Sequence, residues 1–243
     1  MKIFAKSDVG KAREVNQDSY YVSRPSEDVA LCILADGMGG YNGGEIASKL
    51  AIVSAKNYIE SNFAEIEHNK ETILKLIKDA IEYANMIVFE KSKEDETLTG
   101  MGTTIEICLI YNNRVFIGHI GDSRIYRIRK EFMRKLTTDH SYVQKLIKEG
   151  KITKEEALNH PKKHMITRAL GCTSFVEPDI TVKGFQKGDI LVITSDGLTN
   201  MVSDEEIFNV TKENIETSVE RLVQMANDAG GIDNITTIII INN

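Results

Sequence analysis

Four aspartates stand at the ends of short apolar runs, and this arrangement restricts the fold more than any other feature of the 243-residue chain. The residues are Asp36, Asp122, Asp196 and Asp233. Short continuous apolar runs are typical of buried strands. A carboxylate at the rim of a buried sheet is costly to desolvate unless something compensates its charge. We therefore expect the four side chains to converge on one edge of the core.

The apolar runs and their order predict the fold class. Buried strands are expected at residues 29–35, 103–110, 115–120, 190–194 and 235–241, with a further strand at about 123–129. Asn112 and Asn113 are typical of a hairpin turn. Helical periodicity places amphipathic helices around 47–59, 73–88 and 219–226. Helices come in blocks and strands follow one another, so the pattern favours α+β layering with mainly antiparallel sheets.

Helix-start signals mark the polar parts of the chain. Ser203 with Glu206, and Thr153 with Glu156, have the spacing of capping boxes. The second pair lies in a Lys- and Glu-rich region at about 139–163 that has few strand signals. We interpret this region as a helical excursion within one domain.

The composition excludes several classes of protein. The chain has 36 acidic and 30 basic residues and a net charge of −6, which disfavours nonspecific nucleic-acid binding. A local arginine or metal ion can still outweigh that charge, so a phosphorylated ligand stays possible. The three cysteines lie far apart and form no CxxC, which argues against a disulfide framework or a thiolate zinc site. Neither a signal-peptide pattern nor a membrane span is evident, and we expect a cytoplasmic protein.

The acidic cluster predicts a site for hard divalent cations. Oxygen donors without Cys or His favour Mg²⁺ or Mn²⁺ over zinc. The alternative is that each Asp only forms a turn, which is the better interpretation for any single Asp-Gly pair. Four aspartates at strand ends, taken together, favour the metal site over turn formation. Arg13 could clamp phosphate oxygens or be a solvated surface residue, and Asp18 could be a further ligand or a turn residue.

Other catalytic motifs do not fit. The glycine-rich loop at 37–44 follows a strand, but Asn42 stands where a dinucleotide-binding loop needs its third glycine, and no P-loop is present. His160 and His164 have zinc-pair spacing, but Pro161 intervenes and there is no HExxH. His119 lies within a predicted strand, where packing is a better interpretation than catalysis. No nucleophile elbow supports covalent catalysis.

Eight segments together resemble one family, the metal-dependent PP2C-type (PPM) Ser/Thr protein phosphatases, in particular their bacterial members. In chain order they are REVNQD at 13–18, DGMGG at 36–40, GMGTT at 100–104, GHIGDSR at 118–124, LTTDHS at 136–141, ITRALG at 166–171, TSDGL at 194–198 and DNIT at 233–236. The resemblance spans nearly the whole chain. It implies one phosphatase domain over residues 1–243, with a four-layer αββα sandwich of two central, mainly antiparallel sheets flanked by helix pairs. It also implies a flap-like insertion at about 141–163.

The resemblance further implies two Mn²⁺ or Mg²⁺ ions in the core site and room for a third. By position, Asp36 bridges both ions, the Gly37 carbonyl binds one, and Asp18 acts through water. Asp196 and Asp233 complete the shell, and Asp122 with Asp196 matches a third-metal position. Arg13 matches the phosphate-binding arginine, so the catalytic residues implied are Arg13 and Asp36.

The implied activity is hydrolysis of phosphoserine and phosphothreonine in proteins by a metal-activated water, without a phosphoenzyme. Implied partners are phosphorylated proteins and a cognate Ser/Thr kinase, and we expect a monomer with neither nucleic acid nor membrane as partner. Alternatives are a phosphatase of small metabolites or nucleotides, and a noncatalytic regulatory module on the same fold. Met38 departs from the pattern, because many eukaryotic relatives have there a His proposed as the leaving-group acid. Water or another side chain must then protonate the leaving oxygen.

Overall fold

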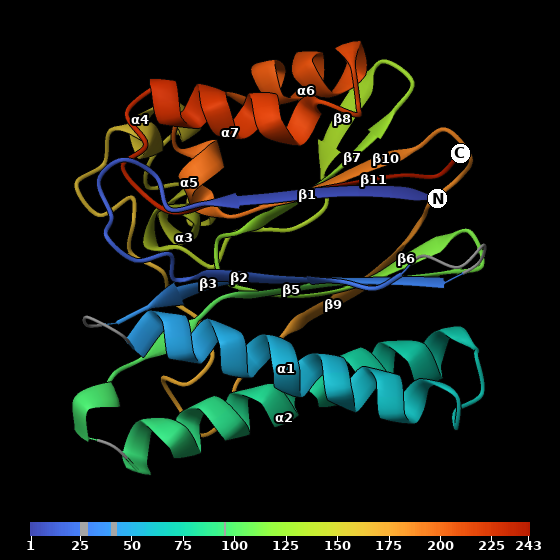
Figure 1. Cartoon of the computed structure of the whole chain (residues 1–243). Coiled ribbons are helices and arrows are strands. Elements are labelled where there is room, and N and C mark those ends of the chain that lie inside the picture. The colour runs from blue at the N-terminus through green and yellow to red at the C-terminus, as the bar shows by residue number, and fades with distance from the viewer. Residues whose placement is uncertain (25–28, 40–42, 95) are drawn as a thin grey trace.

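Two stacked β-sheets lie between two pairs of helices in the computed structural model, which describes residues 1–24, 29–39, 43–94 and 96–243 (Figure 1). On one outer face lie α1 (Gly43–Phe63) and α2 (Lys70–Glu94). On the other lie α6 (Asp204–Glu213) and α7 (Ser218–Asp228). The expected αββα sandwich is therefore confirmed, and both termini lie at the same end of the stack (Figure 1).

All paired strands of both sheets are antiparallel. The sheet beside α6 and α7, here the first sheet, has the order β1 (Lys2–Asp8), β11 (Ile235–Ile241), β10 (Ile190–Thr194), β7 (Arg124–Arg129) and β8 (Phe132–Lys135). The second sheet, beside α1 and α2, has the order β2 (Asp18–Val22), β3 (Val29–Met38), β5 (Ile105–Tyr111), β6 (Arg114–Ile120) and β9 (Asp179–Gly184), and β4 (Gly102–Thr103) pairs with β3. The central strands carry side chains that are buried on both faces, as a sandwich requires.

Three apolar clusters fill the spaces between the four layers. Along β3, Leu31 and Ile33 face α1 and α2, whereas Cys32 and Leu34 face the first sheet. This alternation follows from the two-residue period of a strand. Each fully buried aliphatic side chain contributes about 1.5–3 kcal/mol relative to exposure. The cluster between the sheets fixes their separation, and so positions the two sets of strand ends that carry the aspartates.

Most of the elements predicted from periodicity are confirmed. Asn112 and Asn113 both have positive φ, at 47° and 55°, between β5 and β6, as a type I′ hairpin turn requires. Both capping boxes are present at α6 and at α4 (Lys154–Leu158). The strands β2, β8 and β9 were not predicted, because their side chains are largely half-buried or exposed and the apolar signal is weak.

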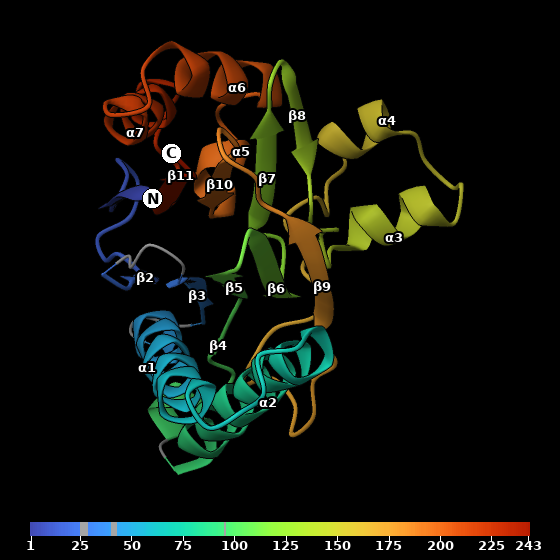
Figure 2. The same ribbon diagram turned by 90° about the vertical axis from the view of Figure 1, so that its right-hand side faces the viewer.

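The polar segment 141–163, here called the flap, forms two short helices. These are α3 (Tyr142–Lys148) and α4 (Lys154–Leu158), and Figure 2 shows them standing to one side of the stack, near β8. An isolated bridge between Ser141 and Ile166 closes the base of the flap. The remaining short helices are η1 (Glu96–Leu98) and α5 (Asp196–Thr199). In the described ranges, every helix lacks the length or the apolar character needed to cross a lipid bilayer.

Truncation of Ile33 tests the packing between the second sheet and its helices. Ile33 is 0% exposed. We expect Ile33→Ala to lower the free energy of unfolding by about 2–5 kcal/mol, and Ile33→Val by about 0.5–1.5 kcal/mol, because the truncation leaves a cavity. Urea unfolding measures both. Val53 is 53% exposed on α1, so Val53→Ala is the matched control. An equal loss for Ile33→Ala and Val53→Ala would contradict this packing.

Candidate metal centre

The aspartates singled out in the sequence lie at the same end of the two sheets, opposite the chain termini (Figure 1). Asp18 begins β2 and is the register partner of Asp36 on β3. Asp122 lies in the turn between β6 and β7. From the first sheet, Asp196 begins α5 directly after β10, and Asp233 precedes β11. Strand order and antiparallel pairing thus bring together residues that are far apart in the chain.

A cavity of about 380 Å³ opens at this end of the stack. Its lining contains six of the predicted site residues, namely Arg13, Asp36, Gly37, Asp122, Asp196 and Asp233. Asp18 is buried beside them, with 7% of its surface exposed. The convergence expected from the sequence is therefore present, whereas the ligand role of each residue stays a prediction.

Burial and mutual repulsion raise the pKa values of these carboxyl groups. Burial raises the pKa of Asp36 well above its ordinary value, and the nearby charges of Asp18 and Asp196 raise it further. The pKa of Asp18 rises to about 7 and that of Asp122 to about 8, with burial as the largest cause in both. Burial, followed by the charge of Asp233, also raises the pKa of Asp196. In the metal-free protein, these carboxyl groups therefore hold their protons to higher pH than exposed aspartates do.

The donor chemistry of the site fits a hard divalent cation. The converging aspartates supply carboxylate oxygens, which are ligands that Mg²⁺ and Mn²⁺ prefer. The Oδ1 atom of Asp18 is buried without a hydrogen-bond partner, and its Oδ2 atom accepts a 2.8 Å hydrogen bond from Ser195. A buried anionic oxygen without a partner is costly unless a cation compensates it.

The carboxylates do not form a complete metal-coordination site in this conformation. Among the described residues, no group of three or more His, Cys, Asp or Glu side chains is arranged to hold a metal ion as it stands. Two observations explain this. Arg13 donates to Oδ2 of Asp233 at 2.9 Å, and Asn200 donates to Oδ2 of Asp196 at 3.0 Å. Because like charges repel, each of these two half-buried carboxylates is oriented toward a neighbouring donor in place of its acidic neighbours.

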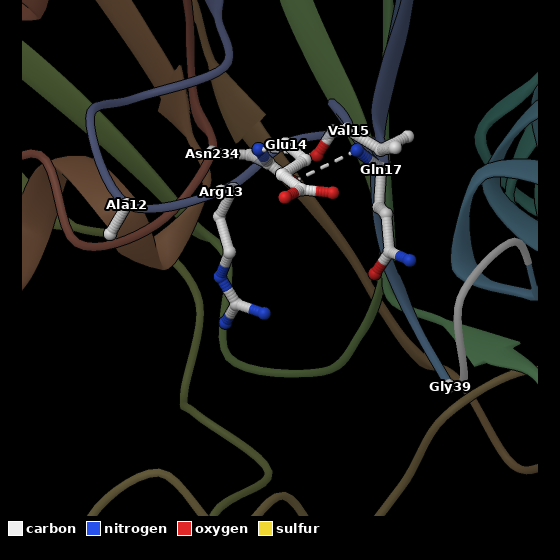
Figure 3. A pocket seen from close by; sticks show the side chains of 7 residues that line it. All are labelled: Ala12, Arg13, Glu14, Val15, Gln17, Gly39 and Asn234. Atoms are coloured by element: carbon white, nitrogen blue, oxygen red, sulfur yellow. Dashed lines mark hydrogen bonds between the residues drawn. The ribbon is translucent and has the colours of Figure 1, made fainter.

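Asn234 holds the loop that carries Arg13. Its side-chain amide donates to the carbonyl oxygens of Val9 at 2.9 Å and Val15 at 3.0 Å. Its Oδ1 atom accepts from the backbone N–H of Gln17 at 2.9 Å (Figure 3). The loop is thereby fixed to the start of β11, and Figure 3 shows the Arg13 guanidinium extending into the open space in front of it. Asn234 lies in a quoted motif, but its positioning role was missed because it depends on three distant backbone groups.

Two glycines of the site are required by close backbone approaches. A Cβ atom on Gly37 would lie 2.0 Å from the carbonyl oxygen of Gly44, at the start of α1. A Cβ atom on Gly197 would lie 2.0 Å from the carbonyl oxygen of Asn234. Any side chain would push these segments apart, and with them Asp36 and Asp196. In these two Asp-Gly pairs, glycine is therefore required by close backbone packing and not only by a turn.

A buried network supports the turn that carries Asp122. His119 is 1% exposed, and its ring nitrogens lie 3.0 Å from Oε1 of Glu106 and 3.0 Å from the carbonyl oxygen of Thr138. The ring stacks on His140, whose Nδ1 atom accepts from the N–H of Gly121 at 3.1 Å. His119 is thus packed in the core, as its place in a strand indicated.

Met38 and His164 both line the cavity. His164 follows the flap and, among the described lining residues, is the one imidazole. The interpretation of His164 as half of a zinc pair was rejected from the sequence. Its place at the cavity was missed, because nothing in the local sequence signals that the flap returns to the carboxylates.

Two antiparallel sheets stacked between helix pairs are the fold that this chain shares with solved structures of bacterial Ser/Thr phosphatases. PstP/Ppp of Mycobacterium tuberculosis superposes with a TM-score of 0.89 at 35% identity, covering 100% of this chain and 99% of that one. The catalytic domain of PstP in complex with two manganese ions gives a TM-score of 0.86 at 35% identity, covering 98% and 96%. Protein phosphatase PhpP of Streptococcus pneumoniae is 39% identical over 250 residues, covering 99% of this chain and 97% of that protein.

The family model described as protein phosphatase 2C matches residues 10–237. The chain therefore belongs to the protein phosphatase 2C family, as the eight segments indicated.

The raised pKa values predict how the stability of the metal-free protein depends on pH. Folded Asp18 and Asp122 retain protons up to about pH 7 and pH 8, whereas the ordinary value is 3.8. The folded state then binds more protons than the unfolded state, so stability falls as pH rises. We expect the melting temperature in EDTA to fall between about pH 6.5 and pH 8. Added Mn²⁺ should raise it most at the upper end.

The variant Asp18→Asn identifies the source of this pH dependence. It removes one buried charge, so it should raise the melting temperature of the metal-free protein at pH 8 and flatten the profile. His119 has a raised pKa and contributes a loss of the same sign, which Asp18→Asn leaves in place. A profile in EDTA that is flat or rises over this range would contradict the repulsion described here.

Proposed function

We propose that this chain is a metal-dependent protein-serine/threonine phosphatase, formed as one domain over residues 1–243 with a flap at about 141–163. The observation that carries the proposal is the convergence of carboxylates from both sheets on one cavity beside Arg13. Family membership and relatives that are named Ser/Thr or protein phosphatases support it.

In this proposal Asp36, Asp196, Asp233 and the Gly37 carbonyl hold two Mn²⁺ or Mg²⁺ ions, with Asp18 acting through water and Asp122 available for a third. Paired cations of this kind supply a water made acidic enough to act as a nucleophile near neutral pH. The carboxylates would hold these cations at the end of the sheets, beside the proposed phosphate-binding Arg13. Thr104 positions Asp36, because its hydroxyl accepts from the Asp36 N–H at 3.0 Å and its own N–H donates to the Asp36 carbonyl at 2.9 Å.

Arg13 is proposed to bind the phosphate oxygens of the substrate. A guanidinium can make two parallel hydrogen bonds to a phosphate. The Arg13 side chain is 52% exposed at the mouth of the cavity, where a phosphorylated side chain could reach it. Its bond to Asp233 must exchange for phosphate when substrate and cations are present, because Asp233 is then a ligand.

The thioether of Met38 cannot protonate the leaving oxygen, so that proton comes from water or another side chain. We propose phosphorylated Ser/Thr proteins as partners, among them a cognate kinase, and a monomer that acts in the cytoplasm. Hydrolysis of small phosphorylated metabolites is the alternative for the same centre. A comparison of phosphopeptides with sugar phosphates separates the two.

Neutral variants of the proposed ligands test the metal-dependent reaction. We expect Asp36→Asn and Asp196→Asn each to lower kcat for p-nitrophenyl phosphate in Mn²⁺ by about 100-fold or more. The cations are worth several kcal/mol of barrier, and 1.36 kcal/mol is tenfold in rate. Asp79 pairs with Lys75 on the surface of α2, so Asp79→Asn is the matched control. Turnover that persists in EDTA or in both site variants would refute the proposal.

Loss of Arg13 should act mainly on substrate binding. We expect Arg13→Ala to raise KM with a smaller change in kcat, because the guanidinium binds phosphate in both the ground state and the transition state. Steady-state kinetics at saturating Mn²⁺ measure both constants. A large fall in kcat at unchanged KM would contradict this role.

A further inference from the structure

The cavity over the carboxylates continues beneath the flap. A second cavity of about 690 Å³ lies between the flap, β7 and the start of α6. It shares three lining residues with the first cavity, namely Asp122, His164 and Asp196. The two therefore form one cleft that leads from the carboxylates outward between the flap and the body of the protein. We call the part beneath the flap the flap cleft.

The flap contributes several apolar side chains to the wall of the flap cleft. Val143 and Ile147 of α3 and Leu158 of α4 line it, and Leu158 is 69% exposed. A single phosphate group would occupy only the carboxylate end of such a cleft. Its volume of about 690 Å³ and its apolar side chains suit a peptide segment.

The flap carries a charge opposite to that of the rest of the protein. Residues 141–163 contain six lysines and three glutamates, in a chain whose net charge is −6. The flap is thus a basic segment of a protein that is acidic as a whole. This contrast favours partners with negative charge on the flap side of the cleft.

Internal ion pairs leave two lysines of the flap cleft available. Arg124 and Lys135 also line it, but both donate to the carboxylate of Asp139, at 2.9 Å each. In contrast, Lys154 and Lys163 line the cleft and form no ion pair within the described part of the chain. Lys154 acts on neighbouring Glu155 only through space.

The remaining acidic groups of the flap cleft do not cancel this charge. Asp122 and Asp196 belong to the proposed cation site, where bound cations would neutralise them. Asp139 lines the cleft as well, but Arg124 and Lys135 neutralise it. Among the described lining residues, Asp204 at the start of α6 is then the one carboxylate left, and it accepts a 2.8 Å hydrogen bond from the Tyr126 hydroxyl. Two exposed ammonium groups therefore face one carboxylate.

We propose that the flap cleft binds the peptide segment beside the phosphorylated residue, and that Lys154 and Lys163 select segments with acidic side chains there. The proposal rests on the proposed phosphatase activity and adds the substrate class that the same site prefers. Acidic side chains of the peptide pair with the two lysines, while its apolar side chains contact Val143, Ile147 and Leu158. The preference is electrostatic, so added salt weakens it.

The test uses phosphothreonine peptides of one sequence whose flanking positions carry Glu, Gln or Lys on either side. For the full chain in Mn²⁺, we expect kcat/KM to be about fivefold higher for a Glu flank than for a Gln flank, with most of the difference in KM. A Lys flank should be poorer than Gln. The double variant Lys154→Gln/Lys163→Gln should abolish the preference while p-nitrophenyl phosphate turnover stays unchanged.

Lys151→Gln is the matched control, because Lys151 is a flap lysine that pairs with Glu149 at 2.7 Å and does not line the cleft. It should keep the preference. Equal kcat/KM for all flanks, or a preference that the double variant retains, or one that Lys151→Gln loses equally, would overturn the inference and leave the phosphatase proposal intact. Absence of metal-dependent turnover on any phosphopeptide and on p-nitrophenyl phosphate would instead overturn the phosphatase proposal, and this inference with it.

Discussion

Repulsion between buried carboxylates is the constraint on which this structure depends. Five aspartates from two sheets meet at one end of the sandwich, and burial with neighbouring charge raises the pKa of Asp18, Asp36, Asp122 and Asp196. Such an arrangement costs folding free energy, so the surrounding core must supply it. Three apolar clusters, on both outer faces and between the sheets, hold the strand ends in place despite the repulsion.

The same constraint explains the contacts around the site. Ser195 gives Asp18 one hydrogen bond, Asn200 gives Asp196 one, and Arg13 gives Asp233 an ion pair. The Oδ1 atom of Asp18 is left buried without a partner, which a fully satisfied structural network would not do. The remaining capacity of these oxygens is what a hard cation can use. In this way a local instability of the metal-free fold and a proposed affinity for Mn²⁺ have one physical origin.

The charged groups of the flap differ in their surroundings from the carboxylates of the site. Acidic groups lie deep, where desolvation makes their interactions strong, whereas the flap lysines lie at the exposed rim, where water and salt weaken them. The buried carboxylates are therefore suited to the proposed catalysis. The exposed flap lysines are suited to the proposed selection of substrates. The shared lining residues Asp122, His164 and Asp196 connect these two regions within one cleft.

The α+β class, the mainly antiparallel sheets, the hairpin at Asn112 and Asn113 and the capping boxes could be predicted from the sequence, because local periodicity and turn chemistry encode them. The sequence also singled out the aspartates, since an acid directly after an apolar run is visible without any contact. The full αββα sandwich came from the family resemblance, and so did the ligand roles.

Contacts between distant segments could not be predicted from the sequence and are seen only in the folded chain. The pairing of Arg13 with Asp233, the anchoring of a loop by Asn234 and the return of His164 to the cavity join residues from opposite parts of the chain. The same holds for Lys154 and Lys163. In the sequence they are two lysines among many, and only packing of the flap beside β7 and α6 shows that they face a cleft while Arg124 and Lys135 are neutralised. The sequence shows which residues are charged. Whether a charge is neutralised depends on its distance from other charged groups, and folding sets that distance.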